Sequence, residues 1–111
     1  MQISIFGFGK IGKNFIENIF DGELDELVAI FDSNELMWGD SIIDSISVCS
    51  PQNINNYDFE YLIITSSYES EILTQISQYY DRNKIISIDD YSRMVYTRKR
   101  YASRYKKMIS I

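Results

Sequence analysis

The chain has 111 residues, of which 45% are hydrophobic and 24% charged, and a formal net charge of −5. This length suits one domain with a real core, but it is shorter than a complete dinucleotide-dependent dehydrogenase, which needs a second domain for its substrate. A single cysteine, Cys49, and the absence of histidine exclude an internal disulfide and the usual zinc sites. The sequence shows no apolar run of bilayer length and no signal-peptide pattern, so we expect a cytoplasmic protein without a transmembrane segment.

The first third of the chain has the pattern strand, tight turn, helix, strand. Residues 2–6 are mostly β-branched or aromatic and predict a buried strand that ends at Gly7. Apolar residues at helical spacing predict a helix over 10–20, which the residues at 21–22 end. Residues 27–31 are continuously apolar, as is typical of a parallel strand covered on both faces.

Strands and connections continue to alternate in the rest of the chain. We expect an irregular or helical piece at 32–39, strands at 46–49, 61–65 and 84–88, a loop at 51–56 and a helix at 70–80. Right-handed crossovers then predict a doubly wound sheet with strand order 3-2-1-4-5. The predicted fold class is therefore α/β, a three-layer Rossmann-like domain over residues 1–90 with about five parallel strands.

Three glycines, Gly7, Gly9 and Gly12, form a Gly-x-Gly-x-x-Gly turn between the first strand and the helix. In such a turn the first glycine permits the tight bend, the second lets a pyrophosphate approach the backbone, and the third allows close helix packing. The helix start at Lys10 and Ile11 would present amides to an anion. The alternative is that the glycines serve chain geometry alone.

Asp32 ends the second strand, twenty residues after Gly12. In this position a carboxylate can accept hydrogen bonds from ribose hydroxyls and repel a 2′-phosphate, which favours NAD or another unphosphorylated ribose over NADP. The alternative is that Asp32 caps the next turn through Ser33 and Asn34, and both roles can hold together.

Two serines, Ser66 and Ser67, follow the fourth predicted strand at the carboxyl edge of the sheet, where open α/β sheets bind ligands. They either contact the ligand or cap the next helix. Lys10 either approaches a phosphate or is solvated. Trp38 either closes over the ligand or packs under the sheet edge.

No reaction is indicated by the sequence. Tyr80 and Lys84 match the Tyr-x-x-x-Lys pair of short-chain dehydrogenases, but that pair needs one continuous helix, which residues 81–83 interrupt. Without histidine the most common general base is missing, and no nucleophile triad or metal-ligand group replaces it. Catalytic residues are therefore left unassigned and enzymatic activity stays open.

Charge is divided between two segments of the chain. Residues 1–90 contain sixteen acidic and four basic residues, a formal charge of −12, whereas residues 91–111 contain seven basic residues and no acid. We expect 91–111 to be a basic helical segment. Four of its residues have spacings compatible with one face of a helix: Met94, Tyr101, Tyr105 and Met108. We expect it to dock on its own domain, on a second copy or on a catalytic partner, whereas a free tail would indicate an anionic partner. No nucleic-acid partner is expected.

Over residues 1–88 the sequence resembles the small Rossmann domain of bacterial surface-polysaccharide proteins, such as the N-terminal region of sugar acyltransferases and nucleotide-sugar dehydratases. The resemblance is carried by the glycine turn and by short motifs near Asp32, Trp38, Pro51 and Ser66. It implies that the polar residues after the second strand and the serine turn after the fourth line a nucleotide or nucleotide-sugar cleft. Members of that family normally continue into a catalytic domain.

The leading hypothesis is a nucleotide-binding module, for NAD or a nucleotide-sugar, in a bacterial polysaccharide or sugar-modification system. Its predicted binding residues are Gly7, Gly9, Lys10, Ile11, Gly12, Asp32, Ser33, Asn34, Ser66 and Ser67. One alternative is a nicotinamide-dependent oxidoreductase or sugar-modifying subunit completed by a partner protein. Another is a non-catalytic interaction protein with a vacant cleft.

Overall fold

A single mixed sheet organises the protein. The computed structural model describes residues 1–39, 41–43 and 46–109, and within these ranges six strands lie in the order β3-β4-β2-β1-β5-β6. The strands are β1 (Gln2–Phe6), β2 (Glu26–Phe31), β3 (Ser41–Ile43), β4 (Ile46–Cys49), β5 (Tyr61–Ile64) and β6 (Ile85–Ser87). All neighbouring pairs are parallel except β3 with β4, which is antiparallel.

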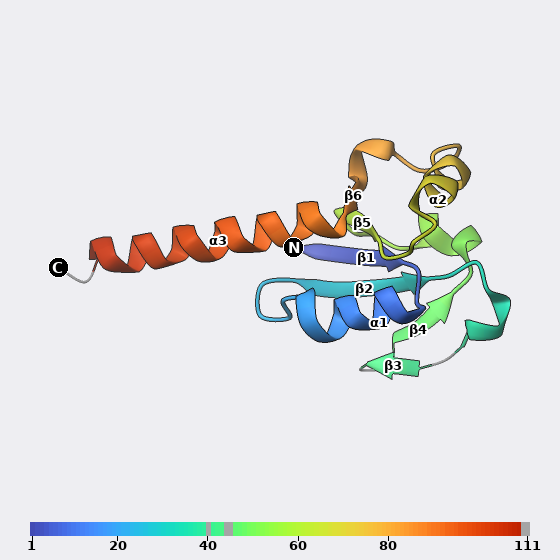
Figure 1. The fold of residues 1–111 in the computed structure, drawn as a ribbon, viewed down its shortest axis with the longest axis horizontal. Helices are drawn as coiled ribbons and strands as arrows, with labels where there is room; N and C mark the ends of the chain where they lie inside the picture. The colour runs from blue at the N-terminus through green and yellow to red at the C-terminus, as the bar shows by residue number, and fades with distance from the viewer. Residues whose placement is uncertain (40, 44–45, 110–111) are drawn as a thin grey trace.

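Helical segments of several kinds connect the strands. They are α1 (Lys10–Asn14), the π-helix η1 (Phe15–Ile19), the 3-10 helices η2 (Glu35–Met37), η3 (Pro51–Asn56) and η4 (Arg82–Lys84), α2 (Glu69–Ile76) and α3 (Ile88–Ile109). Figure 1 shows α1 over β2, α2 beside β5 and β6, and α3 as a long rod that follows β6.

The predicted sheet order is confirmed. The five parallel strands β4-β2-β1-β5-β6 have the predicted order 3-2-1-4-5, so the protein has an α/β Rossmann-like fold with a C-terminal helix. The sequence analysis missed β3, which pairs Ser41 with Ser47 and Ile43 with Ile46 at the edge of the sheet.

Several predicted element boundaries need correction. The helix expected over 10–20 is α1 followed by a π-turn, in which Phe20 donates its amide hydrogen to the carbonyl of Phe15 at 2.8 Å. The wider turn keeps the rings of Phe15 and Phe20 together, 6.4 Å apart. The loop expected at 51–56 is the 3-10 helix η3, and α2 ends at Ile76 instead of residue 80. The last strand is shorter than expected because α3 already begins at Ile88.

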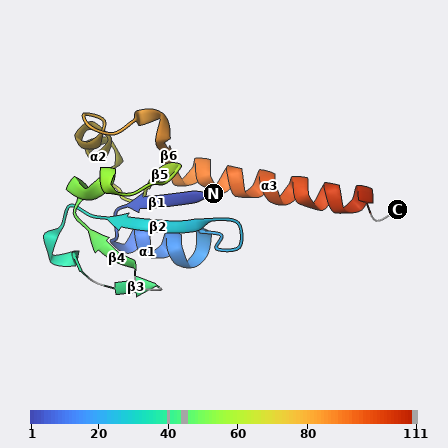
Figure 2. The same cartoon turned by 180° about the vertical axis from the view of Figure 1, so that it is seen from behind.

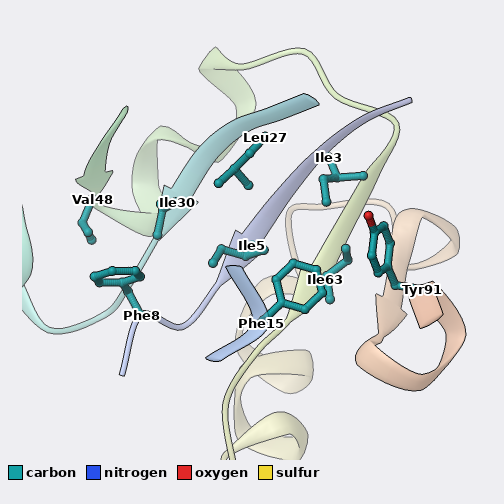
Figure 3. Close-up of a cluster of buried hydrophobic side chains, with 9 residues drawn as sticks. All are labelled: Ile3, Ile5, Phe8, Phe15, Leu27, Ile30, Val48, Ile63 and Tyr91. Atoms are coloured by element: carbon teal, nitrogen blue, oxygen red, sulfur yellow. The ribbon is translucent and has the colours of Figure 1, made fainter. Parts of the chain in front are cut away.

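Each face of the sheet carries its own core. On one face Ile3 and Ile5 of β1 pack with Phe15 and with Tyr91 of α3, as Figure 3 shows. On the other face Phe6 and neighbouring strand residues pack with Ile54 of η3 and the buried residues of α2. Side chains alternate between the faces of a strand, so β1 supplies Ile3 and Ile5 to one core and Phe6 to the other.

Phe8, inside the glycine turn, is part of the core. Its ring packs with Ile30 and Val48, and only 8% of the residue is exposed (Figure 3). Between β2 and β4 the described residues form η2 and β3, and no long helix is among them. Phe8 therefore covers apolar sheet surface that a crossover helix commonly covers in this fold class.

The basic segment forms α3, and its first half docks on the domain. Tyr91 is fully buried, and Arg98 binds Asp25. Tyr101, which we expected on the packed face, is instead 72% exposed. Figures 1 and 2 both show that α3 passes the start of β1 and projects beyond the sheet. Residues 110–111, also in the predicted segment, lie outside the described residues. None of the helices in the described part of the chain has the length and hydropathy to cross a membrane.

Candidate functional site

Two of the three glycines are required by the backbone itself. Gly7 has a φ of +118°, and a Cβ placed there would lie 2.6 Å from the carbonyl oxygen of Thr65. At Gly12 a Cβ would collide with the carbonyl oxygen of Gly7, because the start of the helix lies directly against the turn. The first and third glycines therefore serve turn geometry and close helix packing, as the sequence predicts.

Gly9 is different, because nothing in the protein occupies the space above it. No heavy atom lies within 4 Å of a Cβ built at this position, and its φ of −81° suits any residue. Among the described side chains none caps the first turn of α1, which contains no acidic residue. The position therefore leaves backbone accessible at the start of a helix, where anions bind.

A buried threonine holds the glycine turn against the neighbouring strand. Thr65, directly after β5, donates its hydroxyl hydrogen to the carbonyl of Gly7 at 2.6 Å, and its amide donates to the carbonyl of Phe6 at 3.0 Å. The sequence pattern predicts Thr65 only as the end of the strand at 61–65. Its position opposite the glycine turn, at the carboxyl end of an adjacent strand, is the signal that could have identified it.

Asp32 is half-buried and organises two backbone segments. One carboxylate oxygen accepts the amide hydrogen of Phe8 at 2.8 Å, and the other accepts that of Asn34 at 2.8 Å. The turn-capping interpretation is thus confirmed. Each carboxylate oxygen has a second lone-pair position, so capping leaves Asp32 able to accept a further hydrogen bond. The ribose contact stays a prediction.

The segment after Asp32 is fixed by side-chain hydrogen bonds. Asn34 caps η2 by accepting the amide hydrogen of Leu36 at 3.1 Å. The indole nitrogen of Trp38 donates to the carbonyl of Asp32 at 2.7 Å, although 40% of the residue remains exposed. Trp38 is therefore held beside Asp32 with part of its ring open to solvent.

The serine turn after β5 does not cap α2. Ser66 accepts the amide hydrogen of Tyr68 at 3.1 Å, and Tyr68 precedes α2 without a side-chain cap. The alternative of a helix cap formed by Ser66 or Ser67 is therefore wrong. Both serines instead line a hollow next to the glycine turn.

Three adjoining hollows form a groove along the carboxyl edge of the sheet. The first, of about 330 Å³, is lined by Gly7, Gly9, Lys10, Ile11, Asp32, Asn34, Met37, Thr65, Ser66, Ser67 and Tyr68. The second, of about 280 Å³, shares Gly7, Asp32, Ser66 and Tyr68 with it and adds Phe6, Ser33, Glu71, Ile72 and Gln75. The third, of about 600 Å³, shares Ser33 and Gln75 with the second. The structure thus brings all the predicted site residues except Gly12 to the groove, and Gly12 lies behind the turn.

The third hollow was missed by the sequence analysis. It is lined by Ser33, Trp38, Ser50, Pro51, Gln52, Asn55, Gln75 and Tyr79. These residues offer two aromatic rings and three side-chain amides. None of them is charged at neutral pH, and burial raises the pKa of the one titratable side chain among them, Tyr79, above 10.0. In contrast, the first hollow has Lys10 and Asp32 as charged groups. Within the described residues no cluster of histidine, cysteine or acidic side chains could hold a metal ion.

The strand order, the glycine turn after β1 and the groove at the carboxyl edge define a Rossmann-like α/β domain. The chain belongs to the family described as C2185-like, N-terminal, whose model matches residues 1–86.

Two solved structures have a similar fold. The crystal structure of RSP in complex with beta-NADH is 17% identical, with a TM-score of 0.56 over 96% of this chain and 63% of that chain. The crystal structure of RSP in complex with beta-NAD+ and operator DNA is 17% identical, with a TM-score of 0.55 over 96% of this chain and 60% of that chain. The protein thus spans less than two thirds of either RSP chain, and the likeness concerns the fold. No curated protein matches the sequence.

Proposed function

We propose that this domain binds a nucleotide with an unphosphorylated ribose, NAD or a nucleotide-sugar, in the groove. The observation that carries the proposal is the difference among the glycines. Gly7 and Gly12 are required by the fold, whereas Gly9 faces open space and is conformationally ordinary. Because the fold does not require a glycine at position 9, we attribute this glycine to a ligand group that occupies the open space above it. In a Gly-x-Gly-x-x-Gly turn that group is a phosphate.

The groove has its chemical groups in the order of a nucleotide. Phosphate would lie at Gly9 and Lys10 in the first hollow, and ribose at Asp32, which lines the first and second hollows. The base would enter the third hollow, which is uncharged and contains Trp38 and Tyr79 for stacking. The amides of Gln52, Asn55 and Gln75 provide both donors and acceptors for a polar ring edge.

The comparisons favour a nicotinamide nucleotide as the first ligand to test, because the RSP structures of similar fold contain beta-NADH and beta-NAD+. A nucleotide-sugar and a role in bacterial surface-polysaccharide synthesis rest on the sequence resemblance. The proposal assigns binding and no reaction. A partner protein that supplies catalytic residues to a nucleotide bound in the groove is compatible with this proposal.

The decisive experiment is calorimetric titration of the chain with NAD, NADP and UDP-glucose. A Gly9→Val variant should lose binding, since its side chain fills the phosphate position without meeting any protein atom. Gly22→Val is the matched control, because Gly22 lies in the turn before β2, remote from the groove, and a Cβ there meets only the Phe20 ring at 3.6 Å. Circular dichroism should show that both variants are folded. Unchanged affinity in Gly9→Val, or no binding of any of the three nucleotides by the parent, would refute the proposal.

A further inference from the structure

The half of α3 that leaves the domain is the largest feature the nucleotide site does not explain. Among the described side chains, the ion pairs of Arg98 with Asp25 and of Lys99 with Asp21 are the contacts with the domain nearest the C-terminal end of α3. The helix continues to Ile109, which at 1.5 Å per residue is about 15 Å further. Figures 1 and 2, seen from opposite sides, both show this part clear of the sheet.

The exposed surface of α3 has the composition of a protein interface. Tyr96 is 66% exposed and Tyr101 72%, and the Arg93 side chain is 80% exposed. Tyrosine and arginine are enriched among the residues that dominate binding energy at interfaces.

The cations of the projecting part have no acidic neighbours on their own helix. After Asp90 the sequence contains no acidic residue, while Arg100, Arg104, Lys106 and Lys107 follow the last contact with the domain. Arg98 and Lys99 show what such residues do when carboxylates are available, since each pairs with an aspartate of the turn before β2. Arg100, which directly follows these two residues, is exposed and forms no ion pair among the described residues, so it is open to a carboxylate of another molecule.

Suitable carboxylates lie at the edge of the sheet that α3 passes. Glu23 is in the turn before β2, Glu26 begins β2, and Glu60 directly precedes β5; all three are exposed. Glu26 and Glu60 flank the first residues of β1, because their amides donate to the carbonyls of Met1 and Gln2 at 2.9 and 2.8 Å. In the described part of the chain none of these three glutamates forms an ion pair.

We infer that the partner of the projecting helix is a second copy of this chain. Two copies related by a two-fold axis place the projecting half of each α3, which contains Tyr101, against the amino edge of the other copy's sheet. The basic half of each helix then reaches the glutamates at the amino edge of the other copy. A two-fold interface must be self-complementary, and a surface with a basic helix next to an acidic edge meets that condition. The inference is independent of the nucleotide, because the groove lies at the opposite edge of the sheet.

The test is a charge exchange between two variants, followed by sedimentation velocity of the full chain. The helix variant carries Arg100→Glu and Arg104→Glu, and the edge variant carries Glu23→Lys and Glu26→Lys. Each variant alone reverses one side of both symmetric contacts, so each should sediment as a monomer at concentrations where the parent is a dimer. We expect the dissociation constant to rise by about tenfold or more, as for close charge pairs across interfaces. Mixing the two variants should restore a dimer, because every contact is again between opposite charges.

A matched control separates this effect from net charge. Arg82→Glu with Lys84→Glu changes the total charge as much as the helix variant does, but in η4, and should leave the dimer intact. Circular dichroism of all variants establishes folding. A monomeric parent overturns the inference, as does a dimer insensitive to both charge reversals or variants that do not associate on mixing. Binding of a monomeric parent to phosphatidylserine vesicles would assign α3 to a membrane surface instead.

Discussion

Asp25 and Arg98 form a two-pronged ion pair, with guanidinium nitrogens 2.7 and 2.8 Å from the two carboxylate oxygens. Asp25 directly precedes β2 and its side chain is fully buried, whereas Arg98 lies in the middle of α3. Tyr91 donates its hydroxyl hydrogen to the same carboxylate at 2.7 Å. One buried carboxylate therefore fixes α3 to the sheet at two points, Tyr91 and Arg98, about two helical turns apart.

The Asp25 cluster predicts a loss of stability in acid. Burial raises the pKa of Asp25, but hydrogen bonds from Arg98 and Tyr91 and the charge of Arg98 outweigh it, so the pKa is lowered below 3.8. A carboxyl group with a lower pKa in the folded state stabilises the fold above its unfolded pKa, and this contribution is lost as the pH falls through the folded value. Denaturant unfolding should show the free energy of unfolding falling below about pH 4.

An Asp25→Asn variant should lose this acid dependence, and its free energy of unfolding at neutral pH should fall by roughly 2 to 4 kcal/mol. This loss is smaller than for fully buried ion pairs because the Arg98 side chain is partly exposed. Asp21→Asn is the control, because Asp21 pairs with the largely exposed Lys99 and should contribute much less. Equal losses in the two variants would contradict a special role for Asp25.

Two substitutions at Tyr91 distinguish the contribution of packing to stability from that of hydrogen bonding. Tyr91→Phe keeps the ring on Phe15, whose centroid is 5.2 Å away, but removes the hydroxyl that donates to Asp25 and accepts the amide hydrogen of Asp21. We expect a loss of about 1–3 kcal/mol for leaving these groups unpaired. Tyr91→Ala should lose about 3–5 kcal/mol because it also opens a cavity. Thermal unfolding of both variants checks the order, and a Tyr91→Phe variant as stable as the parent would show that the hydroxyl contributes nothing.

The glycine turn predicts unequal effects of alanine substitution on stability at Gly12 and at Gly9. Gly12→Ala forces a Cβ onto the carbonyl of Gly7 and should destabilise the fold by about 1–3 kcal/mol. Gly9→Ala meets open space and should change stability by no more than about 0.5 kcal/mol. Denaturant titration measures both. If the two substitutions had the same effect, the distinction on which the phosphate position depends would be lost.

Asp32 predicts a preference between cofactors. If the carboxylate lies at the ribose, NAD should bind more tightly than NADP, and Asp32→Asn should narrow the difference because the negative charge is removed. The asparagine oxygen can still accept one of the two amide hydrogens that Asp32 accepts from Phe8 and Asn34, so the turn is less disturbed than in an alanine variant. Calorimetry with both cofactors tests this. Tighter binding of NADP by the parent would place Asp32 away from the ribose.

The order of the sheet could be predicted because its signals are local. The central strands β2 and β5 contain unbroken apolar runs, at 27–31 and 61–64, and the glycine turn after β1 is recognised from a few residues. The edge strand β3 was missed because three residues carry no such pattern. The π-turn at Phe15 was missed because the spacing of apolar residues hardly differs from that of an α-helix.

The candidate site was predicted where it follows strand ends and missed where it depends on packing. Asp32 and Ser66 follow directly from the carboxyl ends of β2 and β5. Gln75 lies in the last turn of α2, and Tyr79 follows the end of that helix. Both residues reach the groove only because α2 packs on the sheet beside η3. Such an approach depends on the whole core, which the pattern of one segment does not contain.

Phe8 makes the glycine turn part of the folded core. Its amide is held by Asp32, its ring packs with Ile30 and Val48, and the turn next to it is held by Thr65. The loop cannot shift outward without exposing an aromatic ring to water. If a nucleotide binds here as proposed, it meets a loop already held by these contacts, and little conformational entropy should be lost on binding. Association should accordingly proceed in one step, at a rate that rises linearly with ligand concentration and shows no plateau from loop closure.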